Sequence, residues 1–184
     1  MGKTYDHIDE RLSEFIESQS IFFVATAPLA EDGLLNLSPK GLDTLRILDE
    51  QTVAYLDLTG SGVETIAHLK ENGRCVMMFC AFEGRPMILR LHGRGEVFEK
   101  GDPEFERLLP LFPELPGTRS IIRLTVERIA DSCGWAVPLM KHEGDRDQLL
   151  RYAEQKGDDG IRDAQLRANM TSLDGLPGLK GPST

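Results

Sequence analysis

The sequence has few basic residues and no long apolar run, and both absences exclude classes of function. No apolar run approaches the roughly 20 residues that cross a bilayer, and the N-terminal residues lack the apolar centre of a signal peptide. Acidic residues outnumber basic ones by 30 to 21, giving a net charge of -9, whereas a nucleic-acid surface needs a basic face. We therefore expect neither a membrane nor a nucleic-acid partner.

Cysteine and histidine are also scarce. The three cysteines, Cys75, Cys80 and Cys133, are an odd number, and the first two fall in a stretch that predicts a buried strand. Such cysteines are typical of reduced thiols in a cytoplasmic protein, not of a disulfide framework. The four histidines lack the spacing of metal ligands. A cytoplasmic location is expected, and a metal site is not.

Residues 53–99 hold the pattern around which the rest of the chain is organised. Strands are expected at 53–58, 74–82 and 87–99, with a glycine-rich turn at 59–62 and a helix directly after it. Ser61 and Glu64 have the spacing of a capping box at the start of that helix, and Asn72-Gly73 supplies its stop. The run 74–82 is almost continuously apolar, as in a strand buried on both faces.

The flanking segments add strands but few helices. Helices are expected at 9–18, 103–111, 145–156 and 160–170, strands at 21–27, 34–38 and 120–132, a short piece at 46–48, and an extended tail at 173–184. Parallel strands would each need a helical crossover, so this pattern favours an antiparallel barrel. Residues 1–184 are expected to form one domain, with 133–184 as a helical and extended C-terminal extension, because the length suits one core.

Three polar features could bind a ligand, and each also has a plain structural explanation. The turn at 59–62 could hold a phosphate with its backbone N–H groups, or it could be a capped turn without a ligand. Lys40 could contact a phosphate as a point charge, or it could be a solvated lysine. Arg90 could face a ligand or the outside of the barrel. Cys133 has no neighbouring base and is expected to be structural. Trp135 could stack on a flat ligand or pack in the core, and the core is favoured.

The order of these segments along the chain is more informative about fold and function than any single segment. In chain order they are S-P-K-G (38–41), A-Y-L-D-L (54–58), T-G-S-G (59–62), I-A-H-L-K-E-N-G-R (66–74), C-V-M-M-F-C-A-F (75–82) and R-L-H-G (90–93). This series resembles the pyridoxamine 5'-phosphate oxidase-like family of FMN-binding split barrels, over roughly residues 8 to 130. S-C-G-W-A-V-P (132–138) and S-L-D-G-L-P-G-L (172–179) look like a subgroup of that family.

The resemblance implies a fold, a cofactor and an assembly. The fold is mainly β with flanking helices, in the form of a six-stranded antiparallel split barrel. The assembly is a homodimer with FMN at its interface, acting on a small-molecule substrate. The positions that match the family's cofactor site are Ser38, Lys40, Gly41, Leu56, Asp57, Thr59, Gly60, Ser61, Thr65, Ile88 and Arg90.

One departure from the family's pattern concerns the phosphate. The family's serine-arginine-lysine run at the start of the helix is replaced here by Val-Glu-Thr at 63–65. Two cations are missing, so phosphate binding must depend on Lys40, Ser61, Thr65 and an arginine elsewhere. The arginine and histidine that hold pyridoxal phosphate in those oxidases have no match in the C-terminal third. Pyridoxamine 5'-phosphate oxidase activity itself is therefore not expected.

The leading hypothesis is an FMN-dependent oxidoreductase of unknown substrate, in which the flavin carries the chemistry. No side chain is assigned as a catalytic acid or base. A second hypothesis is a flavin-binding module without turnover, acting as a carrier or sensor. A third is a split barrel that holds haem or a deazaflavin; haem would need an axial histidine, and only His92 lies on an expected strand.

Overall fold

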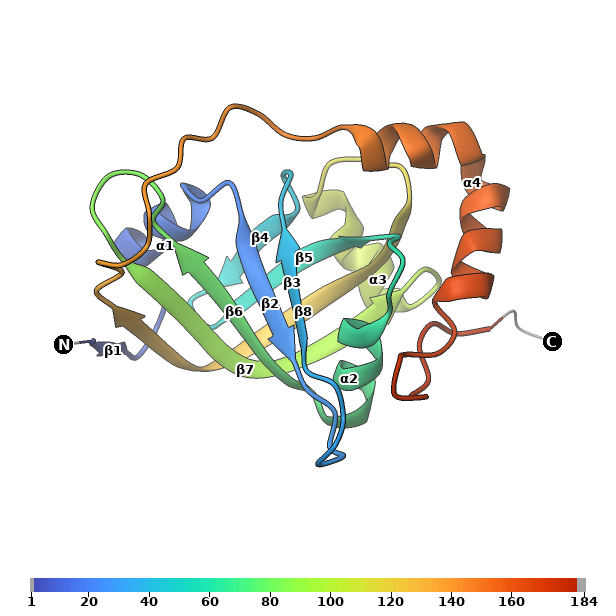
Figure 1. The fold of residues 1–184 in the computed structure, drawn as a ribbon, viewed down its shortest axis with the longest axis horizontal. Coiled ribbons are helices and arrows are strands. Elements are labelled where there is room, and N and C mark those ends of the chain that lie inside the picture. Colours follow the sequence, from blue (N-terminus) through green and yellow to red (C-terminus); the bar gives the residue numbers. More distant parts are fainter. Residues whose placement is uncertain (1, 182–184) are drawn as a thin grey trace.

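The computed structural model describes residues 2–181 (Figure 1). Its strands are β1 (Thr4–Tyr5), β2 (Phe22–Thr26), β3 (Asn36–Lys40), β4 (Leu45–Asp49), β5 (Thr52–Leu58), β6 (Arg74–Cys80), β7 (Ile88–Glu99) and β8 (Thr118–Ser132). Its helices are α1 (Glu10–Glu17), α2 (Glu64–Asn72), α3 (Pro103–Leu108), the short 3-10 helix η1 (Leu109–Leu111) and α4 (Gln148–Ala168).

The strands form a single curled sheet with flanking helices, which confirms the expected fold class. Its order is β3-β2-β6-β7-β8-β5-β4, with β1 paired to β8, and each of these pairs is antiparallel. Eight strands are present instead of six because β1 adds two residues beside β8 and the short piece at 46–48 extends into β4. The hairpin β2–β3 and the pair β5–β4 lie at opposite ends of this order.

Two apolar cores hold the sheet together, and β5 contributes to both. Successive side chains of a strand point to opposite faces. Val53 and Tyr55 therefore face the larger core inside the curled sheet, whereas Ala54 and Leu56 face a smaller core. The smaller core is closed by α3 and η1. The central part of β5 is thus buried on both sides, so its far end at Asp57 is carried into the interior of the protein.

The start of α2 differs from the expectation, although its end agrees. Ser61 does not cap the helix: the N-cap residue is Val63, and no side chain caps this end. The helix ends as expected, because Gly73 takes the left-handed conformation (φ 70°) that a C-terminal stop of this kind requires. Cys75 and Cys80 are buried free thiols in and at the end of β6, as expected.

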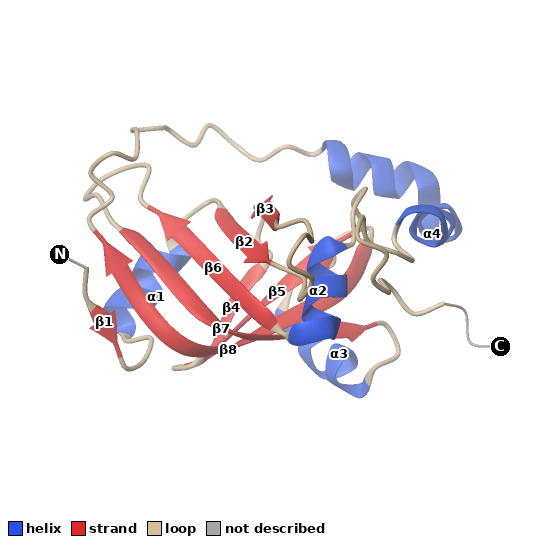
Figure 2. Ribbon diagram, turned by 60° about the horizontal axis from the view of Figure 1, so that its bottom comes forward, coloured by secondary structure: helices blue, strands red, loops and turns tan. Residues whose placement is uncertain are grey.

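The chain after β8 runs across the sheet before it reaches α4 (Figures 1 and 2). Trp135 lies at the start of this segment and is 82% exposed, so the expectation that it packs in the core was wrong. The two expected helices are joined as α4, which kinks at Gly157, where the backbone leaves the helical conformation (φ 62°). The first of them begins at Gln148 and not at residue 145.

The described part of the tail is anchored on α2 and on the end of β7. Leu179 is buried at 6% exposure in the larger core. The Lys70 ammonium donates to the Gly178 carbonyl and to the Glu99 carboxylate, and the Lys180 backbone N–H donates to Glu99 Oε2 at 2.8 Å. The expectation of an extended tail at 182–184 falls outside the described residues. Within residues 2–181, no helix combines the length and the apolar composition of a membrane span.

Candidate functional site

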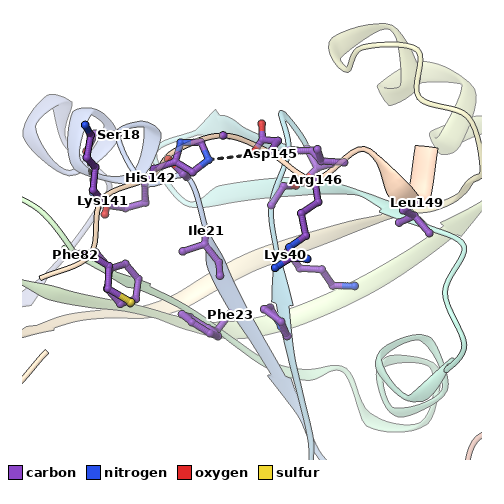
Figure 3. A pocket seen from close by; sticks show the side chains of 18 of the residues that line it. Ser18, Ile21, Phe23, Lys40, Phe82, Lys141, His142, Asp145, Arg146 and Leu149 are labelled. Carbon is purple, nitrogen blue, oxygen red and sulfur yellow. Dashed lines mark hydrogen bonds and ion pairs between the residues drawn. The ribbon is translucent and has the colours of Figure 1, made fainter. Parts of the chain in front are cut away.

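A cavity of about 960 Å³ lies between the β2–β3 hairpin, the end of β5 and the segment that leads to α4. This volume falls within the range of small-molecule sites, about 300–1,000 Å³. Its apolar lining includes Ile21, Phe23, Leu56 and Leu58 on the side of the sheet. Leu149 at the start of α4 faces the same space (Figure 3). A flat apolar ring could therefore be buried between the sheet and the segment above it.

The cavity brings together four of the residues that the sequence singled out. Lys40 and Gly41 reach it from the end of β3, Leu56 from β5 and Gly60 from the turn that follows β5. These strands are far apart in the sheet order, and the curl of the sheet brings their ends together (Figure 1). Residues 40–41 and residues 56–60, which the resemblance assigns to one cofactor site, thus meet at one cavity.

The other predicted residues lie around the cavity or away from it. Asp57 and Thr59 are buried behind its wall, Ser61 is exposed on the turn, and Ser38 faces the polar side chains between β3 and α2. Thr65 is buried, and its hydroxyl accepts from Asn36 Nδ2 at 2.9 Å.

Ile88 and Arg90 lie on β7 and do not line the cavity. The Arg90 guanidinium donates instead to Ser132 Oγ at 3.1 Å.

A buried ion cluster fixes Lys40 at the cavity. Asp57 is 1% exposed and accepts from Arg119 Nε at 2.7 Å, from Lys40 Nζ at 3.1 Å and from Ser120 Oγ at 3.2 Å. Burial alone would raise the pKa of Asp57, but the charges of Arg119 and Lys40 outweigh it and lower the pKa to about 2. The carboxylate is therefore ionised at neutral pH, and it holds Lys40 in position.

Arg119 reaches this cluster because β5 and β8 pair irregularly. Asp57 pairs with Ser120 and Leu58 pairs with Thr118, so Arg119 is the extra residue of a bulge. A bulge redirects a side chain that regular pairing would send elsewhere. The sequence predicted that an arginine elsewhere would be needed but did not identify one, because the bulge leaves no local signal in the chain.

The glycine-rich turn at 59–62 is held by the far end of the chain. Asn169 follows α4 and is fully buried; its Nδ2 lies 3.1 Å from the Gly60 carbonyl oxygen, and its Oδ1 accepts from Arg119 Nη1 at 2.9 Å. Arg119 Nη1 also donates to the Gly62 carbonyl at 2.8 Å. Gln165 on α4 donates from Nε2 to Thr59 Oγ1 at 2.9 Å. The shape of the turn therefore depends on two polar side chains that the sequence analysis missed.

The first turn of α2 does not offer an open phosphate site. The Glu64 carboxylate folds back over Gly62, where it fills the space that a Cβ would occupy. Its Oε1 accepts from the Leu173 backbone N–H at 3.4 Å, so the tail also contacts the first turn of α2. A carboxylate at a helix N-terminus takes the favourable position that a bound anion would otherwise use. The predicted phosphate role of the turn thus has little support from the geometry.

A polar network links the hairpin to α2 behind the cavity. His68 Nδ1 lies 3.0 Å from Thr26 Oγ1, and Asn36 Nδ2 donates to Thr26 Oγ1 at 3.3 Å. Burial lowers the pKa of His68, which keeps the ring neutral at neutral pH. The network holds β2, β3 and α2 in register, and this indirectly positions Lys40 at the end of β3.

The lining of the cavity matches the chemistry of FMN in two respects. The apolar wall and the volume suit a ring system, and Lys40 supplies one cation beside it. The lining therefore fits a flat ligand that carries an anionic group. The anionic group would have to be held at the cavity and not at the start of α2.

Comparison with known proteins places the chain in a family. The family model described as pyridoxamine 5'-phosphate oxidase matches residues 8–133. A pyridoxamine 5'-phosphate oxidase family protein of Aspergillus flavus, ustO, is 38% identical over 192 residues, which cover 95% of this chain and 77% of the relative. That match extends beyond residue 133 into the C-terminal part.

Solved structures share the fold at low identity. A histidine-to-alanine variant of HupZ of Group A Streptococcus has a TM-score of 0.53 at 22% identity, covering 68% of this chain and 99% of the HupZ chain. A candidate pyridoxamine 5'-phosphate oxidase of Lactobacillus delbrueckii has a TM-score of 0.53 at 19% identity, covering 69% and 98%. A protein of Mesorhizobium loti described as FAD-binding has a TM-score of 0.50 at 12% identity, covering 71% and 96%. The fold is that of the split barrels, and the chain belongs to the pyridoxamine 5'-phosphate oxidase family.

Proposed function

We propose that this protein binds FMN in the cavity beside Lys40 and works as a flavin-dependent oxidoreductase on a small substrate. The observation that carries the proposal is the convergence of Lys40, Gly41, Leu56 and Gly60 on one cavity with an apolar wall. These four positions match the family's cofactor site, and membership of the family supports a flavin. A single domain over residues 1–184, with 133–184 as its extension, belongs to the same proposal.

The residues of the cavity would bind and orient the cofactor. Leu56, Leu58 and Phe23 would exclude water from the ring system, and Lys40 would contact an anionic group from a position fixed by Asp57. A bound flavin supplies hydride or electron transfer. Asp57 cannot act as a general acid near neutral pH, because its pKa of about 2 keeps it ionised.

FMN is proposed in preference to FAD. The sequence has no G-x-G-x-x-G unit to hold a pyrophosphate. The FAD-binding relative shares the fold alone, at 12% identity. Pyridoxamine 5'-phosphate is not the proposed substrate, because the residues that hold it in the oxidases have no match here.

The proposed working unit is a cytoplasmic homodimer. Several large apolar side chains are exposed on the hairpin and on the segment after β8: Leu35, Leu37, Trp135 and Leu139. Large apolar side chains left on a surface are a frequent feature of protein–protein interfaces. A second copy of the chain would cover them and would add a wall to the cavity. Light scattering at micromolar concentration tests this, and a monomer would count against it.

The purified protein provides the test of the cofactor. We expect it to be yellow, and we expect heat to release a flavin that chromatography identifies as FMN. Finding FAD would overturn the choice of cofactor. A haem spectrum, or a colourless protein that binds no added flavin, would overturn the proposed function.

A non-catalytic flavin-binding module is the second candidate. It is favoured by one observation: the buried carboxylate nearest the cavity, Asp57, is locked in ion pairs and unable to exchange a proton near neutral pH. Anaerobic mixing of the flavin-loaded protein with NADH or NADPH separates the two candidates. Bleaching of the flavin supports the enzyme, and an unchanged spectrum with both donors supports the module.

A further inference from the structure

The first step concerns where an anion can bind. The start of α2 is taken by the Glu64 carboxylate, and the Thr65 hydroxyl already accepts from Asn36. The carbonyl groups of Gly60 and Gly62 are bound to Asn169 and Arg119. The negative charge of Glu64 at this turn repels an anion, so an anion needs another site.

The second step concerns the segment over the cavity. It is tied to the turn between β6 and β7, because the Met140 backbone N–H donates to the Phe82 carbonyl at 3.0 Å and the His142 N–H to Glu83 Oε1 at 3.3 Å. His142 Nε2 also lies 3.2 Å from Asp145 Oδ1. These contacts hold residues 140–145 above the sheet and deliver the next residue, Arg146, to the cavity.

The third step concerns the charge of Arg146. Its side chain reaches down from the segment into the cavity, on the side where Lys40 lies (Figure 3). Among residues 2–181 no carboxylate lies within 4 Å of its guanidinium, whereas the nearby Arg151 is paired with Asp147 at 2.8 Å. The acidic residues that line the cavity are Glu83 and Asp145, and both already contact His142.

Three lysine and arginine side chains line the cavity, and Lys141 lies near Ser18, away from Lys40 and Arg146 (Figure 3). Lys40 comes from the sheet and Arg146 from the covering segment. Together, Lys40, Asp57 and Arg119 leave one net positive charge behind the sheet wall, and Arg146 adds a second from above. The lining as a whole carries three positive charges, from Lys40, Lys141 and Arg146, and two negative charges, from Glu83 and Asp145, so it is net positive in a chain with a net charge of -9.

We infer that Arg146 and Lys40 form the anion site of the cavity and take the phosphate monoester of FMN between them, an inference that rests on the proposed function. The guanidinium offers a planar fork of donors that matches phosphate oxygens, and the ammonium adds a point charge. The ring system then lies on the apolar wall of Phe23 and Leu56. The family model ends at residue 133, so the pair that was missing at 63–65 is replaced by a residue from beyond the matched region.

The test compares two ligands that differ only in the phosphate. Purified protein freed of any bound flavin is titrated with FMN and with riboflavin, for the wild type, Arg146→Ala, Arg146→Lys and Arg151→Ala. Arg151 is the matched control: it lies five residues further on, carries the same charge and does not line the cavity. Thermal unfolding of each variant checks that it is folded.

We expect Arg146→Ala to weaken FMN binding roughly ten- to hundredfold, as for the loss of a charge-assisted hydrogen bond. Riboflavin binding should stay as in the wild type. Arg146→Lys should recover part of the loss, and the advantage of FMN over riboflavin should shrink as salt is added. Arg151→Ala should leave both affinities unchanged.

Two results would overturn the inference while the proposed function stands: an unchanged preference for FMN over riboflavin in Arg146→Ala, or an equal loss of that preference in Arg151→Ala. Failure of the wild type to bind either flavin would instead overturn the proposed function, and this inference with it.

Discussion

The sheet region, residues 4–132, and the C-terminal region, residues 133–181, are held in place by different forces. The sheet region buries most of its apolar side chains in two cores of its own. The C-terminal region has few buried side chains, and half of them are polar: Ala153, Ile161, Leu179, Gln165, Asn169 and Ser172. It therefore attaches to the sheet region largely through hydrogen bonds and a few apolar contacts.

This difference separates folding from the shaping of the site. Apolar burial is non-directional and scales with area, so it sets the overall fold. Hydrogen bonds are directional, so buried polar groups fix local geometry. The C-terminal region contributes Asn169 and Gln165 to the turn and Arg146 to the cavity. The C-terminal region thus supplies contacts to the turn and part of the cavity lining that the sheet region does not provide.

The largest effect is expected within the sheet region, at Arg119. Arg119→Ala leaves the Asp57 carboxylate buried with only Lys40 as a cationic partner. Removing one member of a buried ion pair costs about 3–5 kcal/mol. Urea unfolding at neutral pH measures this loss, and it should far exceed that of Arg151→Ala, whose exposed pair contributes under about 1 kcal/mol. If Arg119→Ala does not fold, Arg119→Lys should retain part of the stability. Equal losses in the two alanine variants would contradict the prediction.

The second effect is expected where the tail enters the larger core. Leu179→Ala should destabilise the protein by about 2–4 kcal/mol, because it leaves a cavity beside the larger core. Leu173→Ala is the matched control, since Leu173 lies in the same tail and is 76% exposed. Thermal unfolding measures both. An unchanged unfolding temperature in Leu179→Ala would show that the tail lies on the surface without contributing to the larger core.

The third effect is a pH dependence that originates in the sheet region. The pKa of Asp57 is about 2 in the folded protein and 3.8 ordinarily. A lowered folded pKa contributes stability above the unfolded value, and this contribution is lost as the pH falls from about 4 towards 2. The shift corresponds to about 2 kcal/mol. Asp57→Asn should flatten the fall in unfolding free energy over this interval, and an equally steep fall in the variant would contradict the prediction.

Much of the sheet region could be predicted from the sequence. Its strands follow alternation or continuous apolar runs, and the stop at Gly73 follows from its left-handed backbone. The predictions that were wrong rest on patterns within a few neighbouring residues. Ser61 and Glu64 have the spacing of a capping box, but Glu64 folds over Gly62 and contacts the tail instead. A spacing rule could not detect this competition from Leu173, which lies more than a hundred residues further on.

The candidate site could be predicted only in part, for the same reason. Lys40, Gly41, Leu56 and Gly60 carry a recognisable order along the chain and meet at the cavity. Arg119 depends on a bulge, and Asn169 depends on how α4 returns to the turn. Neither residue stands in a local pattern, so nothing along the chain singles them out. The core position expected for Trp135 follows from its being a large aromatic residue, whereas its position after the last strand leaves it exposed.

The last and smallest effect is expected at the junction of the two regions. Asn169→Ala removes the amide from the Gly60 and Gly62 carbonyls and from Arg119, and should cost about 1–3 kcal/mol, as for buried partners left unpaired. Arg167→Ala, two residues earlier and exposed, is the control and should be neutral.

A readout beyond global stability is needed, because a purely structural role would also lower the unfolding free energy. Hydrogen exchange of the backbone amides at 59–62 should accelerate in Asn169→Ala, whereas exchange in the centres of β7 and β8 should stay slow. Flavin binding should weaken in the same variant, because the turn at 59–62 is less ordered. Uniformly faster exchange would mean that Asn169 supports the whole fold. Unchanged exchange at the turn would mean that the sheet region shapes its cavity without the C-terminal region.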